Sequence, residues 1–267
     1  MTITLAYSPC PNDTFMFCSV ATGRLGLDGH DVEVHLHDVE TLNRRALDGV
    51  YDVTKLSFHA WLLAADRYEL LPVGAALGYG CGPVVVSKRD LGPDELAGCR
   101  LAVPGELTTA HMLLRLWRPD VTEKVFVRYD QVMPMVARGE ADAGVIIHEG
   151  RFTYEAAGLR LIADLGQWWQ GETQLPIPLG CIAARKDLGR ETIDGFADLL
   201  RRAVRESFEH PEATEDYVRR YAQEMSPEVL SAHIRTFVND FSLDLGDKGR
   251  DAVAKLRDLA RGAGIIE

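Results

Sequence analysis

Three short polar segments follow apolar runs and carry side chains that could bind or deprotonate a small molecule. They are Lys55 to Ser57, the pair Thr108 and Thr109, and His148. In an open parallel sheet, the segments after the strands gather at one edge, where helix N-termini direct amide groups and a partial positive charge outward. We therefore predict a binding cleft lined by four segments, Ser8–Asp13, Lys55–Ser57, Glu106–Thr109 and His148–Glu149.

His148 is the best candidate for a general base. It follows the apolar run AGVII, and a neutral imidazole at a cleft edge could accept a proton near pH 7. A structural histidine held by hydrogen bonds is the alternative. His111, one turn into a predicted helix, is the second candidate. Glu149 and Arg151 could orient His148 or form an ordinary ion pair, and the sequence does not separate these roles.

The other two segments suit the binding of a carboxylate. Thr108 and Thr109 open a predicted helix, so their hydroxyl and amide groups could hold an acid group, although one of them could serve only as the N-cap. Lys55 lies near the end of an apolar strand, where an ammonium group needs a partner or an open cleft. A surface lysine is the alternative. Ser57 shares the face of Lys55 by strand alternation.

The loop SPCPND precedes a helix predicted from residue 14 to 22. Asn12 and Asp13 can cap this helix or meet a ligand; capping is the simpler expectation, and we include Asn12 among the candidate substrate-binding residues. Cys10 has no identifiable base beside it, so we expect an inert small residue rather than a nucleophile.

Phosphate and metal sites are not indicated. GYGCG at residues 78–82 lacks the G-K-[ST] of a phosphate loop, and no two histidines share a ligand-like helical spacing with an acid. Trp168 and Trp169 could cover an aromatic ligand or could equally be packing residues.

The elements that must position these residues occur in the same order twice. A strand, helix, strand, helix, strand pattern begins at residue 3 and again at about residue 99. Gly49-Val-Tyr-Asp52 and Gly139-Glu-Ala-Asp142 stand at the same point of the two halves, 90 residues apart. All α/β proteins share such alternation, but the correspondence of single residues favours two similar lobes.

Two similar segments, 76–90 and 176–189, would form a pair of crossing strands at the hinge between the lobes. After Gly189 the pattern is helical, and we expect this tail to pack on the first lobe. The predicted domains are therefore a larger, discontinuous first lobe of residues 1–82 and 188–267, and a smaller second lobe of residues 83–187.

The net charge of −11, from 29 basic and 40 acidic residues, opposes binding to nucleic acid or to an anionic membrane surface. The five cysteines form an odd set without a C-x-x-C pair, which is typical of a reducing compartment. The sequence shows no secretion signal and no run of 18 apolar residues. We expect a cytoplasmic protein.

Several long motifs between residue 3 and about residue 245 resemble a known family. They are SPCPNDTFMF, DVETLNRRAL, TKLSFHAW, GYGCGPVVV, VPGELTTA, RYDQVMPMVARGEADAGVIIHEGRFTY and IPLGCIAARKDLG. With these motifs the chain resembles the 1,4-dihydroxy-6-naphthoate synthases of the futalosine pathway of menaquinone biosynthesis.

The resemblance implies a fold, a reaction and site residues. The fold would be α/β and two-lobed, periplasmic-binding-protein-like (type II), each lobe a mostly parallel sheet flanked by helices. The reaction would convert cyclic dehypoxanthine futalosine into 1,4-dihydroxy-6-naphthoate and dihydroxyacetone, without a cofactor or metal. The family's proton acceptor falls on His148. Its substrate-binding positions fall on Lys55, Leu56, Ser57, Thr108 and Thr109.

Two other functions remain open for the same fold: a non-catalytic small-carboxylate-binding protein and the related chorismate dehydratase. The T-T pair together with IIHE favours the naphthoate synthase. In each case we expect a small-molecule carboxylate as the partner, no nucleic acid or membrane, and a monomer or weak homodimer.

Overall fold

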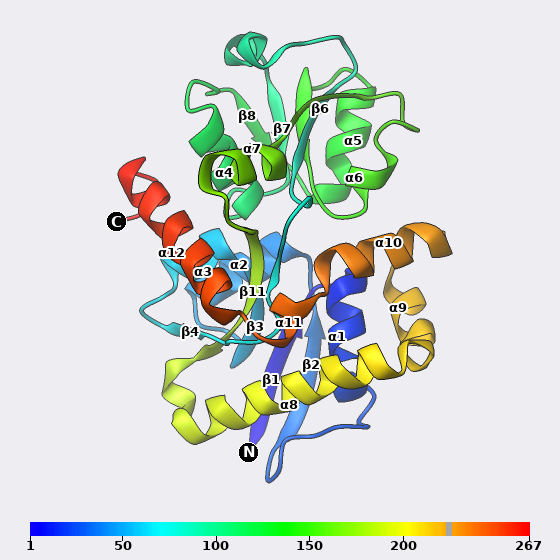
Figure 1. The fold of residues 1–267 in the computed structure, drawn as a ribbon, viewed down its shortest axis with the longest axis vertical. Helices are drawn as coiled ribbons and strands as arrows, with labels where there is room; N and C mark the ends of the chain where they lie inside the picture. Colours follow the sequence, from blue (N-terminus) through cyan, green and yellow to red (C-terminus); the bar gives the residue numbers. More distant parts are fainter. Residues whose placement is uncertain (223–225) are drawn as a thin grey trace.

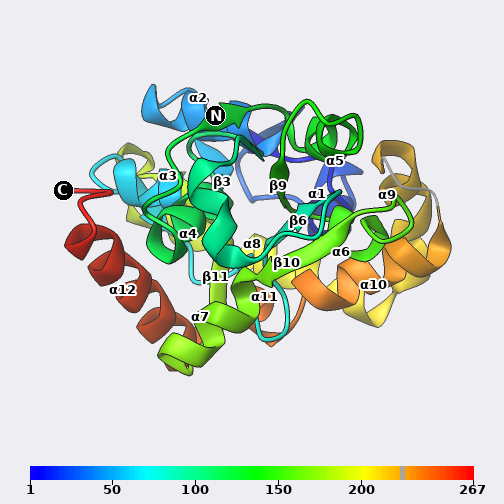
Figure 2. The ribbon, with the colours of Figure 1, turned by 90° about the horizontal axis from the view of Figure 1, so that it is seen from above.

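The computed structural model describes residues 1–222 and 226–267, which form two lobes stacked along the long axis of the molecule (Figure 1). The strands of this described part form one six-stranded and one five-stranded sheet. Figure 2 shows the molecule from the side of the second lobe, with α10 (Pro227–Phe237) and α12 (Gly246–Gly262) on opposite flanks.

The first sheet has the strand order β2-β1-β3-β11-β4, and β5 also pairs with β11. Strands β1, β2 and β3 are parallel, whereas β11 runs antiparallel to its neighbours. Helices α1 and α2 connect the parallel strands, as predicted. The elements are β1 (Thr2–Tyr7), α1 (Pro11–Ala21), β2 (Asp31–Leu36), α2 (Val39–Leu47), β3 (Val53–Ser57), α3 (Phe58–Leu63), β4 (Tyr68–Leu70), β5 (Ala76–Gly78) and β11 (Ile177–Arg185).

The second sheet has the order β10-β6-β9-β7-β8, in which β7, β8 and β9 are parallel and β6 is antiparallel. The sequence β8-β7-β9-β6-β10 repeats β2-β1-β3-β11-β4, so the predicted internal repeat is confirmed. The elements are β6 (Val84–Ser87), β7 (Leu101–Val103), α4 (Thr109–Trp117), β8 (Lys124–Phe126), α5 (Tyr129–Ala137), β9 (Ala143–Ile146), α6 (Gly150–Thr153), β10 (Arg160–Asp164), α7 (Leu165–Thr173) and the 3-10 helix Pro93–Gly98.

The chain crosses between the lobes after β5 and again before β11. Strand β11 then pairs with β3, β4 and β5. Residues 177–185 therefore belong to the first sheet, whereas the predicted boundary at residue 187 put them in the second lobe. The reason is that β6 and β11 occupy equivalent positions in the two sheets, next to β9 and β3. Each crossing strand therefore pairs within the sheet of the lobe that the chain is entering. Because β11 runs antiparallel to β3 and β6 runs antiparallel to β9, each sheet is mixed outside its parallel βαβαβ unit.

The helical tail packs mainly on the first lobe, as predicted, because α8, α9 and α10 all contact α1. Helix α12 is different: it contacts β11 in the first lobe and α4 in the second. The tail consists of the 3-10 helix Lys186–Leu188, α8 (Arg190–Glu209), the 3-10 helix Pro211–Thr214, α9 (Glu215–Tyr221), α10 (Pro227–Phe237), α11 (Asp240–Leu243) and α12 (Gly246–Gly262).

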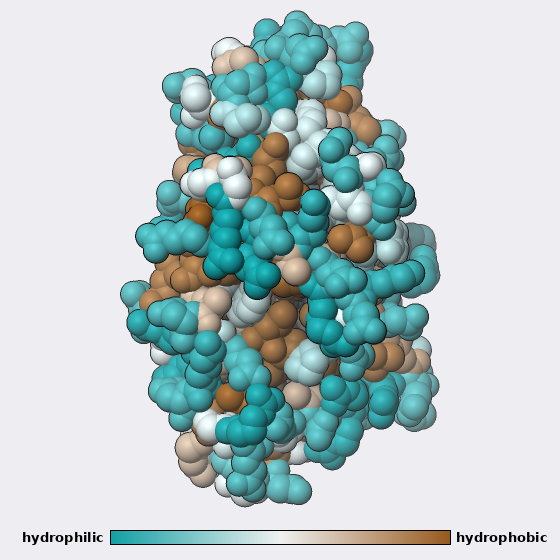
Figure 3. Space-filling view, turned by 60° about the vertical axis from the view of Figure 1, so that its left-hand side comes forward, coloured by the Kyte–Doolittle hydropathy of each residue, from teal (hydrophilic) through white to brown (hydrophobic). Residues whose placement is uncertain are grey.

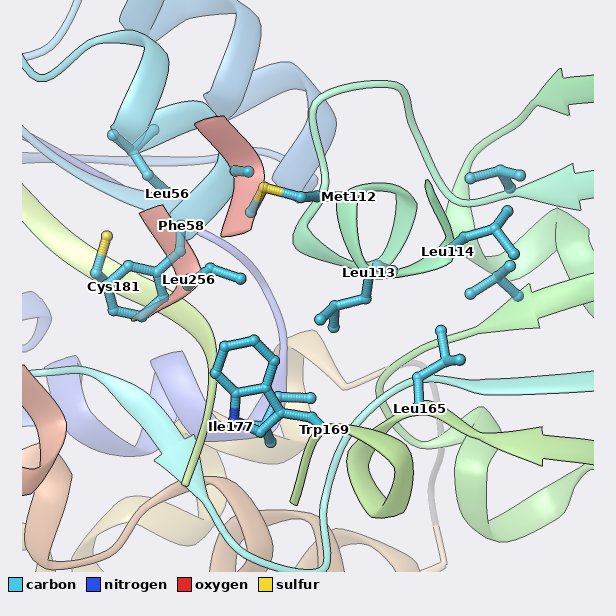
Figure 4. Packing of buried hydrophobic residues seen from close by; sticks show 14 of the residues in the cluster. Leu56, Phe58, Met112, Leu113, Leu114, Leu165, Trp169, Ile177, Cys181 and Leu256 are labelled. Atoms are coloured by element: carbon cyan, nitrogen blue, oxygen red, sulfur yellow. The ribbon is translucent and has the colours of Figure 1, made fainter. Parts of the chain in front are cut away.

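The apolar core has a part in each lobe and a part that both lobes share. Separate clusters lie around α1 and α8 in the first lobe and around α5 in the second. The shared cluster joins Phe58 of α3 and Leu256 of α12 to Met112 of α4 and Trp169 of α7 (Figure 4). On the α12 side, the outer surface is mostly hydrophilic, with small hydrophobic areas near the middle (Figure 3). The lobes are thus joined by packing as well as by the chain.

Candidate functional site

A cavity lies between the two lobes, at the edge where β1, β3 and β9 end. Helix α4 contributes its first turn to the wall, and α10 of the tail closes one side. All the side chains chosen from the sequence as catalytic or substrate-binding line this cavity. They are Asn12, Lys55, Leu56, Ser57, Thr108, Thr109 and His148.

Lys55 is not a surface lysine, because it is only 6% exposed and its Nζ donates to Oδ1 of Asp13 at 2.8 Å. Asp13 is 1% exposed, and its Oδ2 also accepts hydrogen bonds from the amide and the hydroxyl of Ser8, at 3.2 and 2.7 Å. A Cβ at Gly180 would lie 2.9 Å from Cε of Lys55. The absence of a side chain at Gly180 therefore makes room for the lysine stem beside its counter-ion.

The predicted capping of the first helix by Asn12 or Asp13 is wrong. Helix α1 begins at Pro11, three residues earlier than predicted, and its N-cap, Cys10, makes no side-chain capping bond. Asn12 and Asp13 therefore lie within the first turn. The Asn12 amide group donates from Nδ2 to Oδ1 of Asp13 at 2.7 Å, and its Oδ1 lies 3.1 Å from Nε2 of His233.

Ser57 ties the lobes together. Its hydroxyl donates to the carbonyl oxygen of Leu107 at 2.6 Å and accepts from the amide of Ala60 at 3.3 Å. Asn43 of α2 donates to the same Leu107 carbonyl at 3.2 Å. The Ser57 side chain thus lies at the cavity, but its hydroxyl proton is donated to a carbonyl oxygen of the protein.

Glu40 of α2 reinforces this connection between the lobes. Its carboxylate accepts from the amides of Glu106 and Leu107, each at 3.1 Å. A Cβ at Gly105 would lie 2.5 Å from Oε2 of Glu40, so the loop can approach the carboxylate only with a glycine there. Burial raises the pKa of Glu40 although these donors and Arg44 oppose the shift. The loop directly before the threonine pair is thereby fixed to the first lobe.

Thr108 is the N-cap of α4, the alternative left open by its sequence. Its Oγ1 accepts from the amide of His111 at 3.2 Å and donates to the carbonyl oxygen of Gly105 at 3.0 Å. The Thr109 hydroxyl donates to the carbonyl oxygen of Leu179 at 2.8 Å. Both threonines still line the cavity at a helix N-terminus, where amide groups and the helix dipole favour an anionic ligand.

His148 follows β9 by two residues and has a left-handed backbone with φ of 58°. This conformation is uncommon for residues other than glycine, and it tends to occur at functional sites. The ring of Tyr129 lies edge-on at 4.7 Å between centroids. Burial lowers the pKa of His148, against the opposing charges of Glu149 and Asp13. The imidazole is therefore neutral at pH 7 and can accept a proton.

The expectation that Cys10 has no base beside it is wrong. Its Sγ lies 3.2 Å from Nδ1 of His148, a contact between residues 138 positions apart. Burial and the carboxylates of Asp13 and Glu149 raise the pKa of the Cys10 thiol well above its usual range. A neutral thiol is a poor nucleophile, so this contact favours a role in orienting the imidazole ring.

His233 lines the cavity and was not selected from the sequence. It comes from α10, and its ring centroid lies 6.1 Å from that of His148 and 4.7 Å from that of Phe237. A helical pattern predicts which face of α10 is buried, but it does not show that this face meets the cleft.

Three other candidates lie elsewhere. His111 is buried with Nδ1 2.7 Å from the carbonyl oxygen of Glu106, and it is not among the residues that line the cavity. Trp169 is fully buried and donates from Nε1 to the carbonyl oxygen of Pro176 at 3.0 Å. Trp168 packs against the shared apolar cluster. Both tryptophans are therefore packing residues.

Arg151 forms a partly buried ion pair with Asp164 at 2.5 Å and donates to the carbonyl oxygens of Gly82 and Gly80, at 3.0 and 3.3 Å. It therefore braces the first crossing segment and does not orient His148.

Within residues 1–222 and 226–267, no group of three or more His, Cys, Asp or Glu side chains is placed to hold a metal ion. The same residues contain no helix of the length and apolar character that a membrane crossing needs. All five cysteines lie in these ranges and are buried, free thiols.

The two-lobed architecture has known counterparts. A protein of Candida albicans, described as having the generic periplasmic binding protein structural fold, matches with a TM-score of 0.72 and 13% identity. The match covers 100% of this chain and 91% of that chain. At this identity the likeness concerns the fold alone, and it confirms the predicted periplasmic-binding-protein-like class.

Sequence comparison identifies the family. The family described as menaquinone biosynthesis matches residues 3–262. The 1,4-dihydroxy-6-naphthoate synthase of Thermus thermophilus is 49% identical, covering 98% of this chain and 94% of that protein. The enzyme of the same name from Streptomyces coelicolor is 42% identical, covering 99% and 95%. The chain therefore belongs to the menaquinone biosynthesis family and is an enzyme.

Proposed function

We propose that this enzyme converts cyclic dehypoxanthine futalosine into 1,4-dihydroxy-6-naphthoate and dihydroxyacetone, with His148 as the general base. The observation that carries the proposal is a neutral, partly buried imidazole at a cavity between two lobes, which the first turn of α4 also lines. The two relatives that bear the name of this activity support the choice of substrate.

In the proposed mechanism, the N-terminal turn of α4 receives the substrate carboxylate. Amide groups at Thr108 and Thr109 and the helix dipole favour the anion there. The ammonium of Lys55 is already neutralised by Asp13, so its contribution is to keep the cavity wall polar without adding a net charge.

His148 then removes a proton from the substrate. The electron pair left behind moves toward the new aromatic ring as the carbon–carbon bond breaks, and the departing three-carbon fragment takes up a proton with the electron pair of that bond. Because no other reactant enters, the proton removed and the proton returned balance. Closed lobes exclude water from this step.

The test is to mix the purified protein with cyclic dehypoxanthine futalosine and to follow the absorbance and fluorescence of the naphthoate. Formation of that chromophore, with dihydroxyacetone in equal amount, supports the proposal. Tight binding without a chromophore would indicate a carboxylate-binding protein. A new product from chorismate alone would indicate the dehydratase.

We further propose that the enzyme works in the cytoplasm, without a cofactor, and as a monomer or weak homodimer. Five buried thiols without a disulfide support a reducing compartment. Cell fractionation and sedimentation at several protein concentrations test these points, and recovery from an oxidising compartment would contradict the first.

A further inference from the structure

Glu149 and His233 face each other at the boundary between the lobes. Glu149 follows β9 of the second lobe, and His233 lies on α10, which packs on the first. Oε2 of Glu149 and Nδ1 of His233 are 3.9 Å apart, and the side chain of His233 is 1% exposed. Within the described residues, neither atom has a hydrogen-bond partner, although both are buried.

The hydrogen bonds around Asn12 fix the tautomer of His233. Lys55 and the amide group of Asn12 both donate to Oδ1 of Asp13, at 2.8 and 2.7 Å. The Nδ2 group of Asn12 therefore faces Asp13, and its Oδ1 faces Nε2 of His233 at 3.1 Å. Nε2 must carry the proton of this bond. In a neutral ring, Nδ1 then presents a lone pair to Glu149.

Two buried acceptors that face each other without a proton are unfavourable, because each has lost its hydrogen bonds to water. Burial lowers the pKa of His233 well below its ordinary value, and the ammonium of Lys55 acts in the same direction. A free imidazolium at this position is thus disfavoured. A single proton placed between the ring and the carboxyl group satisfies both atoms at once.

We propose that Glu149 and His233 share one proton at the boundary between the lobes, and that this bridge holds the lobes closed with His148 in its reactive position. A hydrogen bond needs the two atoms to approach by about 1 Å, a small further closure of the lobes. The other titratable or charged groups around the pair are His148, Lys55, Asp13, Cys10 and Tyr129.

The position of Glu149 connects the bridge to the base, a step that rests on the proposed function. Glu149 directly follows His148, whose left-handed backbone must be held in place by its neighbours. An anchor on Glu149 fixes the turn that carries His148. Glu149 and His233 are therefore positioning residues, which act on the substrate through His148.

The first experiment uses the protein without substrate, so its outcome does not depend on the proposed reaction. Nitrogen NMR of the histidine rings should show His233 with a proton on Nε2 and a hydrogen-bonded Nδ1. In Glu149→Ala the Nδ1 signal should move to that of a free lone pair, whereas Glu140→Gln, a change on the exposed surface of the second lobe, should leave it unchanged. A His233 ring with identical signals in wild type and Glu149→Ala would overturn the bridge.

The second experiment measures KM and kcat of Glu149 variants. Loss of one charge-assisted hydrogen bond in Glu149→Ala should raise KM about tenfold. Glu149→Gln should recover most of this loss, because its amide can donate to Nδ1. Equal KM values in the Ala and Gln variants would overturn the positioning role. Absence of turnover in the wild type, with the NMR result intact, would reject the proposed reaction and leave the bridge standing.

Discussion

The two lobes repeat one backbone plan down to individual contacts. Oδ2 of Asp52 accepts from the amide of Thr4 at 2.8 Å, and Oδ2 of Asp142 accepts from the amide of Arg100 at 2.9 Å. In both lobes this aspartate directly precedes the third parallel strand of the unit and accepts a hydrogen bond from a backbone amide in or next to the first. The shared contacts stabilise the scaffold and take no part in the cavity.

The lobes differ where they face each other. The first contributes a buried ion pair, Asp13 with Lys55, and a helix start without a capping side chain. The second contributes a helix start capped by Thr108 and a strained turn with His148. The duplicated scaffold therefore supplies two equivalent sets of strand ends. A few side chains make the two sets different, because the first lobe carries a buried ion pair and the second carries a histidine that can accept a proton.

The largest expected effect comes from removing the histidine of the second lobe. His148→Ala should lower kcat by at least about 10²-fold, the lower limit for general-base catalysis, and leave KM nearly unchanged. Naphthoate formation under saturating substrate measures it, with the exposed His210→Ala as the control. Unchanged turnover would reject His148 as the base.

The next prediction concerns the buried ion pair of the first lobe. Lys55→Met leaves the Asp13 carboxylate buried without its counter-ion, so the free energy of unfolding should fall by about 3–5 kcal/mol. Adding Asp13→Asn should restore much of this loss. Denaturant unfolding measures both, and Lys88→Met at the exposed surface is the control. A double variant no more stable than Lys55→Met would contradict the ion-pair account.

Acid should weaken the boundary between the lobes. Burial lowers the pKa of His59 to about 4, and its Nδ1 lies 3.3 Å from the carbonyl oxygen of Thr108. The unfolded chain, with an ordinary histidine pKa of about 6.5, binds the proton more readily, so stability is lost as pH falls from about 6.5 to about 4. His59 alone should account for on the order of 3 kcal/mol. Unfolding at several pH values measures this slope, and an equally steep slope in His59→Gln would contradict it.

A smaller effect concerns the room that Gly180 leaves for the ion pair. A Cβ there would lie 2.9 Å from Cε of Lys55 and 3.1 Å from the carbonyl oxygen of Leu56, so Gly180→Ala should cost about 1–3 kcal/mol of unfolding free energy. Gly171→Ala in α7, with no atom within 4 Å, is the matched control. Equal stability of the two variants would show that the lysine stem shifts freely.

The smallest expected effect tests whether the two lobes are equivalent at the ends of matching helices. Gly49 and Gly139 end equivalent helices with φ of 70° and 74°. Substitution by Ala should cost each lobe about 1 kcal/mol for the left-handed backbone. At Gly49 the side chain of Arg67 must also move, since its Nη1 would lie 2.9 Å from the new Cβ. Paired unfolding curves measure the difference, and a stabilised Gly139→Ala would contradict the equivalence.

The sequence predicts those parts of the fold and site that depend on local order. Lys55 lies near the end of β3, and Thr108 and His148 follow β7 and β9. These residues reach the cavity because the ends of parallel strands converge whatever their packing. The contacts of Cys10 with His148 and of Asn12 with His233 join residues 138 and 221 positions apart, and depend on how the lobes and α10 pack. No local pattern contains that information.

The place of β11 in the first sheet was missed for a related reason. The two segments resemble each other so closely that periodicity predicts a strand in both without indicating which sheet each one joins. Only the pairing of β11 with β3 and β4 decides it.

The apolar cluster around Phe58, Met112, Trp169 and Leu256 has a consequence for how the protein comes apart (Figure 4). Neither lobe has a complete hydrophobic core of its own, because separating the lobes would expose this shared cluster to water. Heating should therefore melt both lobes together in a single calorimetric transition, and neither lobe should persist as an independent folding unit.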